Sequence, residues 1–245
     1  MKIFEIKHEN LLECCSTFQD DTKTFFKLEY CDGGSLIDVM EILDRTLTEI
    51  EICAALKLAL KGLACLNANG FIHHSLKTGN ILVSSNGNVK VGDAHFLNYF
   101  DDNTPIDDRL CWYSPEKITS YNCPSEKEDS WAVGLIALYL YSGCLPWDDL
   151  PVSMKILKIP LLPPPKAPDS ASQLFKDFVS RILVKNPDER PTIEEILNDP
   201  FLLQLSDESS QEIMRTLVSC CNQIDYYYYE EEEEAEMEEE EKEVE

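Results

Sequence analysis

The sequence is poor in positive charge and contains no long apolar run. Its 245 residues include 21 Lys and Arg against 46 Asp and Glu, which gives a formal net charge of -25. Because nucleic acid phosphates are bound by clusters of Lys and Arg, this balance excludes nucleic acid as the expected partner. The longest apolar run, residues 131–141, is interrupted by Gly134 and is too short to cross a bilayer. We therefore predict no membrane span.

Histidine is also scarce, and the cysteines lack the spacing of a metal site. The chain has four His, and its ten Cys include no C-x-x-C pair, so a zinc site is not predicted. Residues 1–10 are mixed and charged and do not resemble a secretory leader. We therefore expect reduced thiols, serving as small apolar side chains, in a cytoplasmic protein.

One segment gathers a lysine, a carboxamide and a carboxylate at the ends of short strands. Residues 71–96 read FIHHSLKTGNILVSSNGNVKVGDAHF. Strands are predicted at 81–83 and 89–91, because Asn86-Gly87 between β-branched residues is a strong hairpin signal. The polar side chains at the strand ends, where phosphate and magnesium chemistry is usually housed, are Lys77, Asn80 and Asp93.

This segment resembles the catalytic and metal-binding loops of eukaryotic protein kinases, which read H-R-D-L-K-x-x-N, a hairpin and D-F-G. Residues 73–80 read HHSLKTGN, and residues 93–95 read DAH. The resemblance implies that Lys77 and Asn80 belong to the catalytic loop and that Asn80 and Asp93 are the candidate Mg²⁺ ligands. It also places Ser75 where the family has its catalytic aspartate.

Further motifs recur in the family's order. Residues 114–116, SPE, are similar to A-P-E, residues 129–134, DSWAVG, match D-x-W-x-x-G, and residues 188–192 read DERPT. The resemblance implies that Asp129 holds the backbone of the catalytic loop and that Glu116 forms an ion pair with Arg190. His73 is interpreted as a buried packing histidine rather than a base.

Residues 29–36, EYCDGGSL, resemble the kinase hinge and the start of the next helix. In the family, the hinge backbone, here Glu29 to Cys31, bonds the adenine of ATP, and Leu28 guards the back of that pocket. The alternative is an ordinary strand-to-helix turn in which Ser35 is the N-cap.

The pattern predicts an α+β protein-kinase-like fold, mainly the helical C-lobe with a remnant two-stranded N-lobe. Strands are expected at residues 11–18 and 24–30, and a core helix at 52–66 follows a capping box at Thr48 and Glu51. Four regions are predicted along the chain: N-lobe strands at 1–30, the C-lobe at 31–205, a possible helix at 206–225 with Ile213, Leu217, Cys220 and Cys221 on one side, and a disordered acidic tail at 226–245.

The departures from the kinase pattern point away from catalysis. No G-x-G-x-x-G occurs in the sequence, and residues 6–10 resemble the loop that follows helix C, so we expect the first three N-lobe strands and most of helix C to be absent. A serine hydroxyl at Ser75 is no base near neutral pH. Where the family has the Phe and Gly of D-F-G, this chain has Ala94 and His95, and where the family has G-T-P, residues 108–110 read DRL.

Two interpretations of the remaining polar groups stay open. Asn80 and Asp93 either hold Mg²⁺ with Lys77 near an ATP phosphate, or they persist for the structure of the loop, and we favour the second. We therefore expect a pseudokinase, acting as a binding, scaffold or allosteric module with protein partners in signalling. The alternative is an ATP-dependent serine/threonine kinase that belongs to a longer product.

Finer features resemble the sterile-twenty group, nearest its Hippo branch. They are residues 29–31 (EYC), 60–63 (LKGL), 121–123 (YNC), 163–165 (PPP) and 183–187 (LVKNP). Residues 230–245 hold twelve Glu and one Lys. This tail either keeps the protein in solution or binds a basic partner surface, and the first interpretation is favoured.

Overall fold

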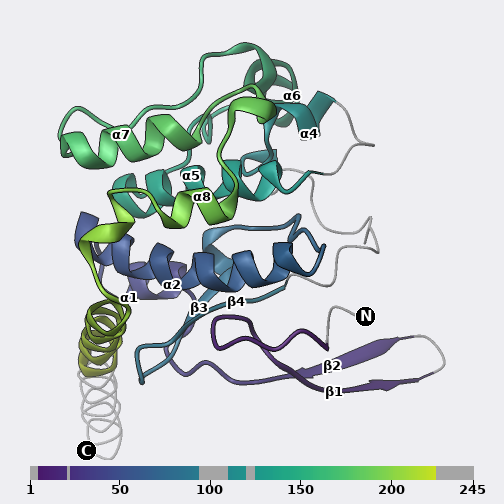
Figure 1. Ribbon diagram of the computed structural model, residues 1–245, viewed down its shortest axis with the longest axis vertical. Helices are drawn as coiled ribbons and strands as arrows, with labels where there is room; N and C mark the ends of the chain where they lie inside the picture. Colours follow the sequence, from purple (N-terminus) through teal and green to yellow (C-terminus); the bar gives the residue numbers. More distant parts are fainter. Residues whose placement is uncertain (1–4, 21–22, 94–109, 120–124, 225–245) are drawn as a thin grey trace, which may run out of the picture.

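The computed structural model describes residues 5–20, 23–93, 110–119 and 125–224. Helices form most of it, and the strands are few and short, which gives the expected α+β content (Figure 1). Several expectations fall outside the described residues: the Ala94-His95 and Asp108-Arg109 positions, the YNC segment at 121–123 and the acidic tail.

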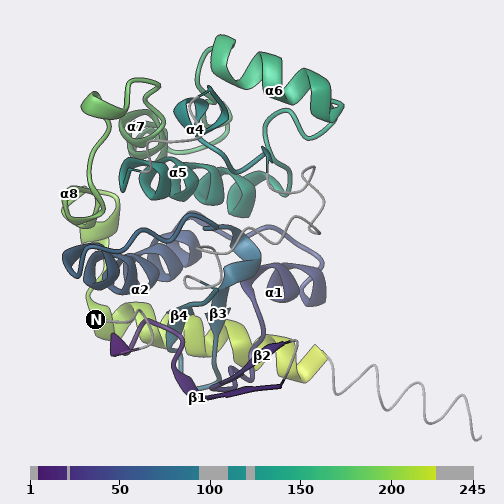
Figure 2. The ribbon, with the colours of Figure 1, turned by 90° about the vertical axis from the view of Figure 1, so that its right-hand side faces the viewer.

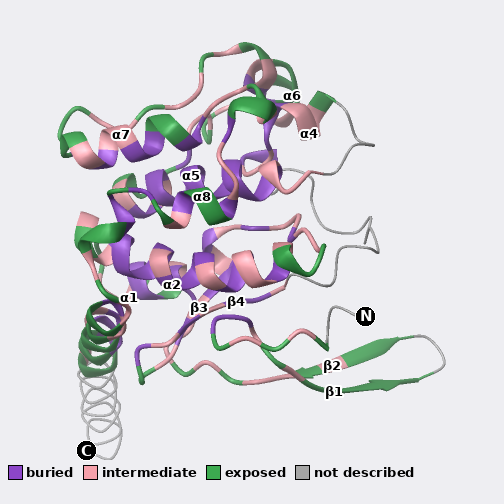
Figure 3. Cartoon of the chain, in the orientation of Figure 1, coloured by how far each residue is buried: buried purple, intermediate pink, exposed green. Residues whose placement is uncertain are grey.

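Two helices form the centre of the fold. Helix α2 spans Glu49–Ala68 and begins with the predicted capping box, in which Thr48 and Glu51 each bond the other's backbone. Helix α5 spans Lys127–Ser142, and its Trp131 is fully buried. Most residues of both helices are buried, as Figure 3 shows, and most of the buried side chains are apolar, so the two helices form the core on which the other elements pack.

The remaining helices surround this pair (Figure 1). Their bounds are α1 Leu36–Ile42, α4 Pro115–Thr119, α6 Val152–Leu161, α7 Gln173–Ile182 and α8 Ile193–Leu197, with short 3-10 helices η2 Thr78–Asn80, η4 Pro187–Glu189 and η5 Leu202–Gln204. Ser35 caps α1 through a second capping box, so the predicted cap is present.

The catalytic-type segment forms the predicted hairpin. Strand β3, Ile81–Val83, pairs antiparallel with β4, Val89–Val91, and Ile81 lies opposite Val91. Gly87 takes a φ of 84° in the connecting turn, a conformation that side chains rarely adopt. The hairpin packs against α2, which places the ends of both strands beside the loop at residues 73–80.

The first two strands form a separate hairpin that is exposed on both faces. Strand β1, Cys14–Gln19, pairs with β2, Thr24–Leu28, and both strands are largely exposed in Figure 3. The rings of Phe18 and Phe25 stack with their centroids 4.9 Å apart. The predicted first strand began too early. Leu11 bridges to Val91 instead, because the backbone of Asn10 and Leu12 is hydrogen-bonded to Val91 before β1 begins.

A helix over residues 207–224 follows the last 3-10 helix and fulfils the prediction of a helix in that region. It runs beside β3 and β4 in Figure 2, and its Arg215 and Gln211 bond the hairpin turn at Asn86 and Asn88. Its buried side chains are Ser210, Met214, Leu217, Val218 and Cys221. Cys220 is exposed, so its predicted place on the apolar side was wrong: consecutive residues of an α-helix point about 100° apart, and Cys221 rather than Cys220 faces the core.

Candidate functional site

Asp129, in the first turn of α5, fixes the backbone of the catalytic-type loop. Its carboxylate accepts hydrogen bonds from the backbone N–H groups of His73, at 2.8 Å, and His74, at 3.1 Å. Burial raises the pKa of Asp129, and the two N–H groups oppose that rise. His74 is held in a left-handed conformation, with a φ of 65°, which lets both N–H groups face one carboxylate.

His73 is buried and structural in its contacts. Its Nε2 donates to the Gly92 carbonyl at 2.8 Å, and its Nδ1 accepts from the Ser75 N–H at 3.3 Å. Both bonds require the neutral ring, because a protonated Nδ1 would face another donor. Burial accordingly lowers the pKa of His73 to about 4.

Asn80 links the catalytic-type loop to the segment after β4. Its Nδ2 donates to the Ser75 carbonyl at 2.9 Å and to the Asp93 carboxylate at 3.3 Å. Burial raises the pKa of Asp93, and His73, Lys77 and Asn80 oppose that rise. Carboxamide and carboxylate oxygens are ligands that suit Mg²⁺, but here the amide nitrogen of Asn80, and not its Oδ1, faces the Asp93 carboxylate.

Ser75, which the sequence predicts at the position of the family's catalytic aspartate, lies in the loop between His74 and Leu76. Its backbone N–H and carbonyl are hydrogen-bonded to the loop, whereas its hydroxyl makes no hydrogen bond to another described residue. The cavity beside Ser75 measures about 20 Å³ and is also lined by Lys77, Trp112 and Lys117. That volume holds a water molecule and little more.

A cluster that the sequence did not reveal lines the same cavity as Ser75. Glu128 is buried, and one carboxylate oxygen lies 3.2 Å from Lys117 Nζ and 3.4 Å from His74 Nδ1. Lys117 also donates to the His74 carbonyl at 2.7 Å and covers the ring of Tyr113 at 4.3 Å. These contacts lower the pKa of Glu128 despite its burial. No signal in the sequence marked this cluster, because an acidic residue in the first turn of a helix is common.

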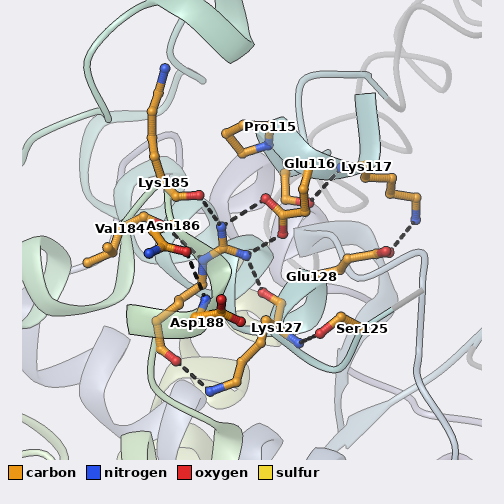
Figure 4. Close-up of polar contacts among 12 residues, drawn as sticks. Pro115, Glu116, Lys117, Ser125, Lys127, Glu128, Val184, Lys185, Asn186 and Asp188 are labelled. Carbon is orange, nitrogen blue, oxygen red and sulfur yellow. Dashed lines mark hydrogen bonds and ion pairs between the residues drawn. The ribbon is translucent and has the colours of Figure 1, made fainter. Parts of the chain in front are cut away.

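Glu116 and Arg190, expected to pair, lie together. Arg190 is fully buried and donates to both Glu116 oxygens, at 2.6 and 3.0 Å. Figure 4 shows the acceptors that surround this pair. The other guanidinium N–H groups bond the carbonyls of Val184, Lys127 and Lys185, so all five donors are used. The pair ties α4 to the segment before α8.

The hinge-like residues lie on the strand and turn that precede α1. The Glu29 carboxylate accepts from the Glu13 N–H at 2.6 Å and pairs with Lys90 at 2.9 Å, which anchors the end of β2 to β4. Leu28 and Cys31 are partly buried beside it, and burial raises the pKa of the Cys31 thiol. The structure thus places Glu29 against the C-lobe hairpin through its side chain.

A comparison with protein-family models matches the protein kinase domain over residues 2–202. The chain belongs to the protein kinase family. The family assignment accounts for the order of the motifs and for the contacts of Asp129, Glu116 and Arg190 described above. The kinase domain match ends before the helix at residues 207–224. Among the described residues, no helix combines the length and apolar character needed to cross a bilayer.

Proposed function

We propose that this kinase-family chain is a pseudokinase, a binding, scaffold or allosteric module that works with protein partners in cytoplasmic, sterile-twenty-type signalling. The observation that carries the proposal is Ser75 at the position of the catalytic base. General-base help is worth about 10²- to 10⁴-fold in rate, and a serine hydroxyl cannot supply it near neutral pH.

Nearby carboxylates offer no substitute for the lost aspartate. Asp129 accepts two backbone N–H groups, Glu128 is engaged by Lys117 and His74, and Asp93 is engaged by Asn80. Each of these bonds holds the carboxylate group in its present position. A base would have to leave such a bond and then reach the hydroxyl of a substrate.

Nucleotide binding is a separate question from phosphate transfer. Asn80 and Asp93 would be the ligands of Mg²⁺ if the Asn80 amide turned its oxygen toward Asp93 in place of its nitrogen, and the ion would neutralise phosphate charge when bound. The Lys77 charge acts on Asp93 and opposes the rise of its pKa. The Asn80 bond to the Ser75 carbonyl also serves the loop without any metal. Because this bond and the bond to Asp93 are both made without a metal, we propose that the structural role of these residues is the main one.

A phosphotransfer assay tests the proposal. We expect the purified chain with Mg²⁺ and radiolabelled ATP to label a mixture of generic protein substrates no more than its Asp93→Asn variant does. A thermal-shift titration with Mg-ATP, run on the chain and on Ser75→Asp, reports nucleotide binding separately. Transfer by the unmodified chain that is lost in Asp93→Asn would refute the pseudokinase proposal and favour the alternative, an ATP-dependent serine/threonine kinase.

The sterile-twenty assignment rests on short segments of sequence. The LKGL segment lies on α2, where Gly62 admits the backbone of Asn10: a Cβ at Gly62 would stand 2.2 Å from the Asn10 carbonyl oxygen. The LVKNP segment supplies two of the carbonyls that Arg190 bonds. These segments therefore have packing roles in this chain, and a phylogenetic placement of the whole domain would test the group.

A further inference from the structure

Strands β1 and β2 form the least covered part of the fold. Among the described residues they pair only with each other, and no third strand joins their sheet. In Figure 1 the hairpin extends from the edge of the fold, and in Figure 3 it is exposed along most of its length. A two-stranded sheet alone is marginally stable in water at best, whereas three or more strands with an apolar face are stable. Further strands would therefore stabilise this hairpin.

The hairpin also carries two exposed aromatic rings. Phe18 on β1 lies opposite Phe25 on β2, and the two rings stack on each other. Each ring nevertheless remains in contact with water, because Phe18 is 60% exposed and Phe25 is 40% exposed. Opposite residues of a sheet point to the same face. The two rings therefore form one small apolar surface on one face of the hairpin, which a further strand with its own apolar side chains would cover.

The edge of β1 lacks the features that keep sheet edges apart. An edge strand presents unpaired N–H and C=O groups, and natural edges are protected by Lys, by Pro or by bulges. Residues 14–19 read CCSTFQ and contain neither a charge nor a proline. A register shift lies between Cys14 and Ser16, and the pairing from Ser16 to Gln19 is regular. Strand β2, in contrast, carries the exposed Lys27. The edge of β1 is thus the one that favours a further strand.

The hairpin is neutral on a strongly acidic chain. Residues 14–28 contain two Asp and two Lys, whereas the whole chain carries a net charge of -25. The two acids that flank the hairpin, Glu13 and Glu29, form ion pairs with Lys7 and Lys90. Charges more than about 8 Å away are largely screened at physiological salt. Two copies of the chain can therefore approach through this hairpin with little repulsion.

We propose that two copies of this chain pair through the edge of β1 and form one four-stranded antiparallel sheet. A two-fold axis at Phe18 places this residue opposite its counterpart in the second copy, and Thr17 opposite Gln19. The outward N–H groups of each strand then meet carbonyls of the other, and no like charges meet along the strands. The proposal does not rest on the loss of phosphate transfer.

The aromatic rings favour a second copy over a strand of another protein. In the proposed register, Phe25 and Phe18 of one copy continue into Phe18 and Phe25 of the other, in a row of four rings on one face. A strand of another protein would form the same backbone bonds without this matching pair. The contact involves few residues from each copy and is smaller than a standard interface of about 1,600 Å², so we expect a weak dimer.

Sedimentation velocity of the full chain over a range of concentrations tests the pairing. We expect a monomer at low concentration and a dimer at high concentration. The two Thr17 side chains are diagonal neighbours across the axis, within reach of each other when they are replaced by longer side chains. Thr17→Lys and Thr17→Glu should each weaken the dimer about tenfold or more, because like charges then face each other. An equimolar mixture of the two variants should dimerise again, because opposite charges then meet.

Thr119→Lys and Thr119→Glu are the matched controls. Thr119 is also an exposed threonine, but it lies on α4, at the other end of the molecule in Figures 1 and 2. We expect both controls to dimerise as the unmodified chain does. All four variants should melt alike, because the changed side chains are exposed.

Hydrogen exchange locates the contact. We expect amide exchange in residues 14–19 of the unmodified chain to slow as the concentration rises, because newly bonded N–H groups are protected. In Thr17→Lys the same amides should exchange at a rate that does not depend on concentration.

The proposal is wrong if the chain stays monomeric, if the dimer survives in Thr17→Lys, or if the mixed Lys and Glu variants do not dimerise. An equal loss of the dimer in the Thr119 variants, or slowed exchange outside the hairpin only, would assign the contact to another surface. A monomeric chain that binds a labelled extended peptide of alternating Thr and Val would assign the edge to a strand of another protein.

Discussion

The buried pair of Glu116 and Arg190 gives the sharpest test of how this domain is held together. Glu116→Gln keeps the shape of the side chain but removes the charge that faces a fully buried guanidinium. Arg190→Met removes all five donated hydrogen bonds and a contact with the Trp131 ring, 5.1 Å from the guanidinium carbon. The double variant removes both partners of the pair.

The expected magnitudes follow from burial. Breaking a buried ion pair from one side costs about 3 to 5 kcal/mol, and the Glu116 side chain is 20% exposed, so the lower value, about 3 kcal/mol, applies to Glu116→Gln. Arg190→Met also deprives three carbonyls of donors, which raises its cost to about 5 kcal/mol. In the double variant no buried guanidinium is left without its carboxylate partner, so Glu116→Gln adds little cost. The double variant should therefore cost about the same as Arg190→Met alone.

Urea unfolding at neutral pH measures these costs. With a slope of about 3 kcal/mol per molar, Glu116→Gln should lower the midpoint by about 1 M. Lys7→Met, which removes the exposed ion pair with Glu13, is the control and should not move the midpoint measurably. If the double variant costs the sum of the two single variants, the carboxylate and guanidinium are not coupled, and our account of this pair is wrong.

Two further predictions concern the loop and the last helix. His73 has a pKa of about 4 in the fold against 6.5 for the free side chain, so the unfolded chain takes up the proton first as the pH falls. This term stabilises the fold fully above pH 6.5 and weakens by about 3 kcal/mol down to pH 4, and urea unfolding of His73→Gln should show a flatter pH dependence than the unmodified chain. Gly87→Ala should lower the melting temperature more than Gly70→Ala, because both have positive φ but only a Cβ at Gly87 would meet the helix at 207–224, 2.1 Å from the Gln211 carbonyl oxygen. Equal melting temperatures would mean that the helix at 207–224 does not limit the space for a side chain at position 87.

Elements with strong local signals could be predicted from the sequence. The hairpin at residues 81–91 follows from alternating apolar residues around Asn86-Gly87, and α2 follows from the capping box at Thr48. The pairing of Leu11 with Val91 could not, because a bridge between residues so far apart leaves no mark in either segment. Hydrophobic pattern alone would place Leu157 in the core and Lys155 outside, and the structure has the reverse.

The candidate site likewise contains residues that the sequence revealed and residues that it did not. Asp129 and Arg190 were recognisable from motifs, whereas the Glu128 cluster was not, because its partners His74 and Lys117 come from separate segments that only the fold brings together. Sequence motifs report the contacts that a family shares. They do not report the contacts that one chain has acquired around them.

The pattern of kept and lost residues has a physical explanation. Asp129, Asn80 and Arg190 each satisfy backbone N–H or carbonyl groups, so replacing any of them would leave buried polar groups unbonded. The Ser75 hydroxyl bonds no other described residue, so a change at this position leaves no polar group of the fold unsatisfied. A replacement at Ser75 therefore costs the fold little, whereas a replacement at Asp129, Asn80 or Arg190 removes bonds to buried backbone groups.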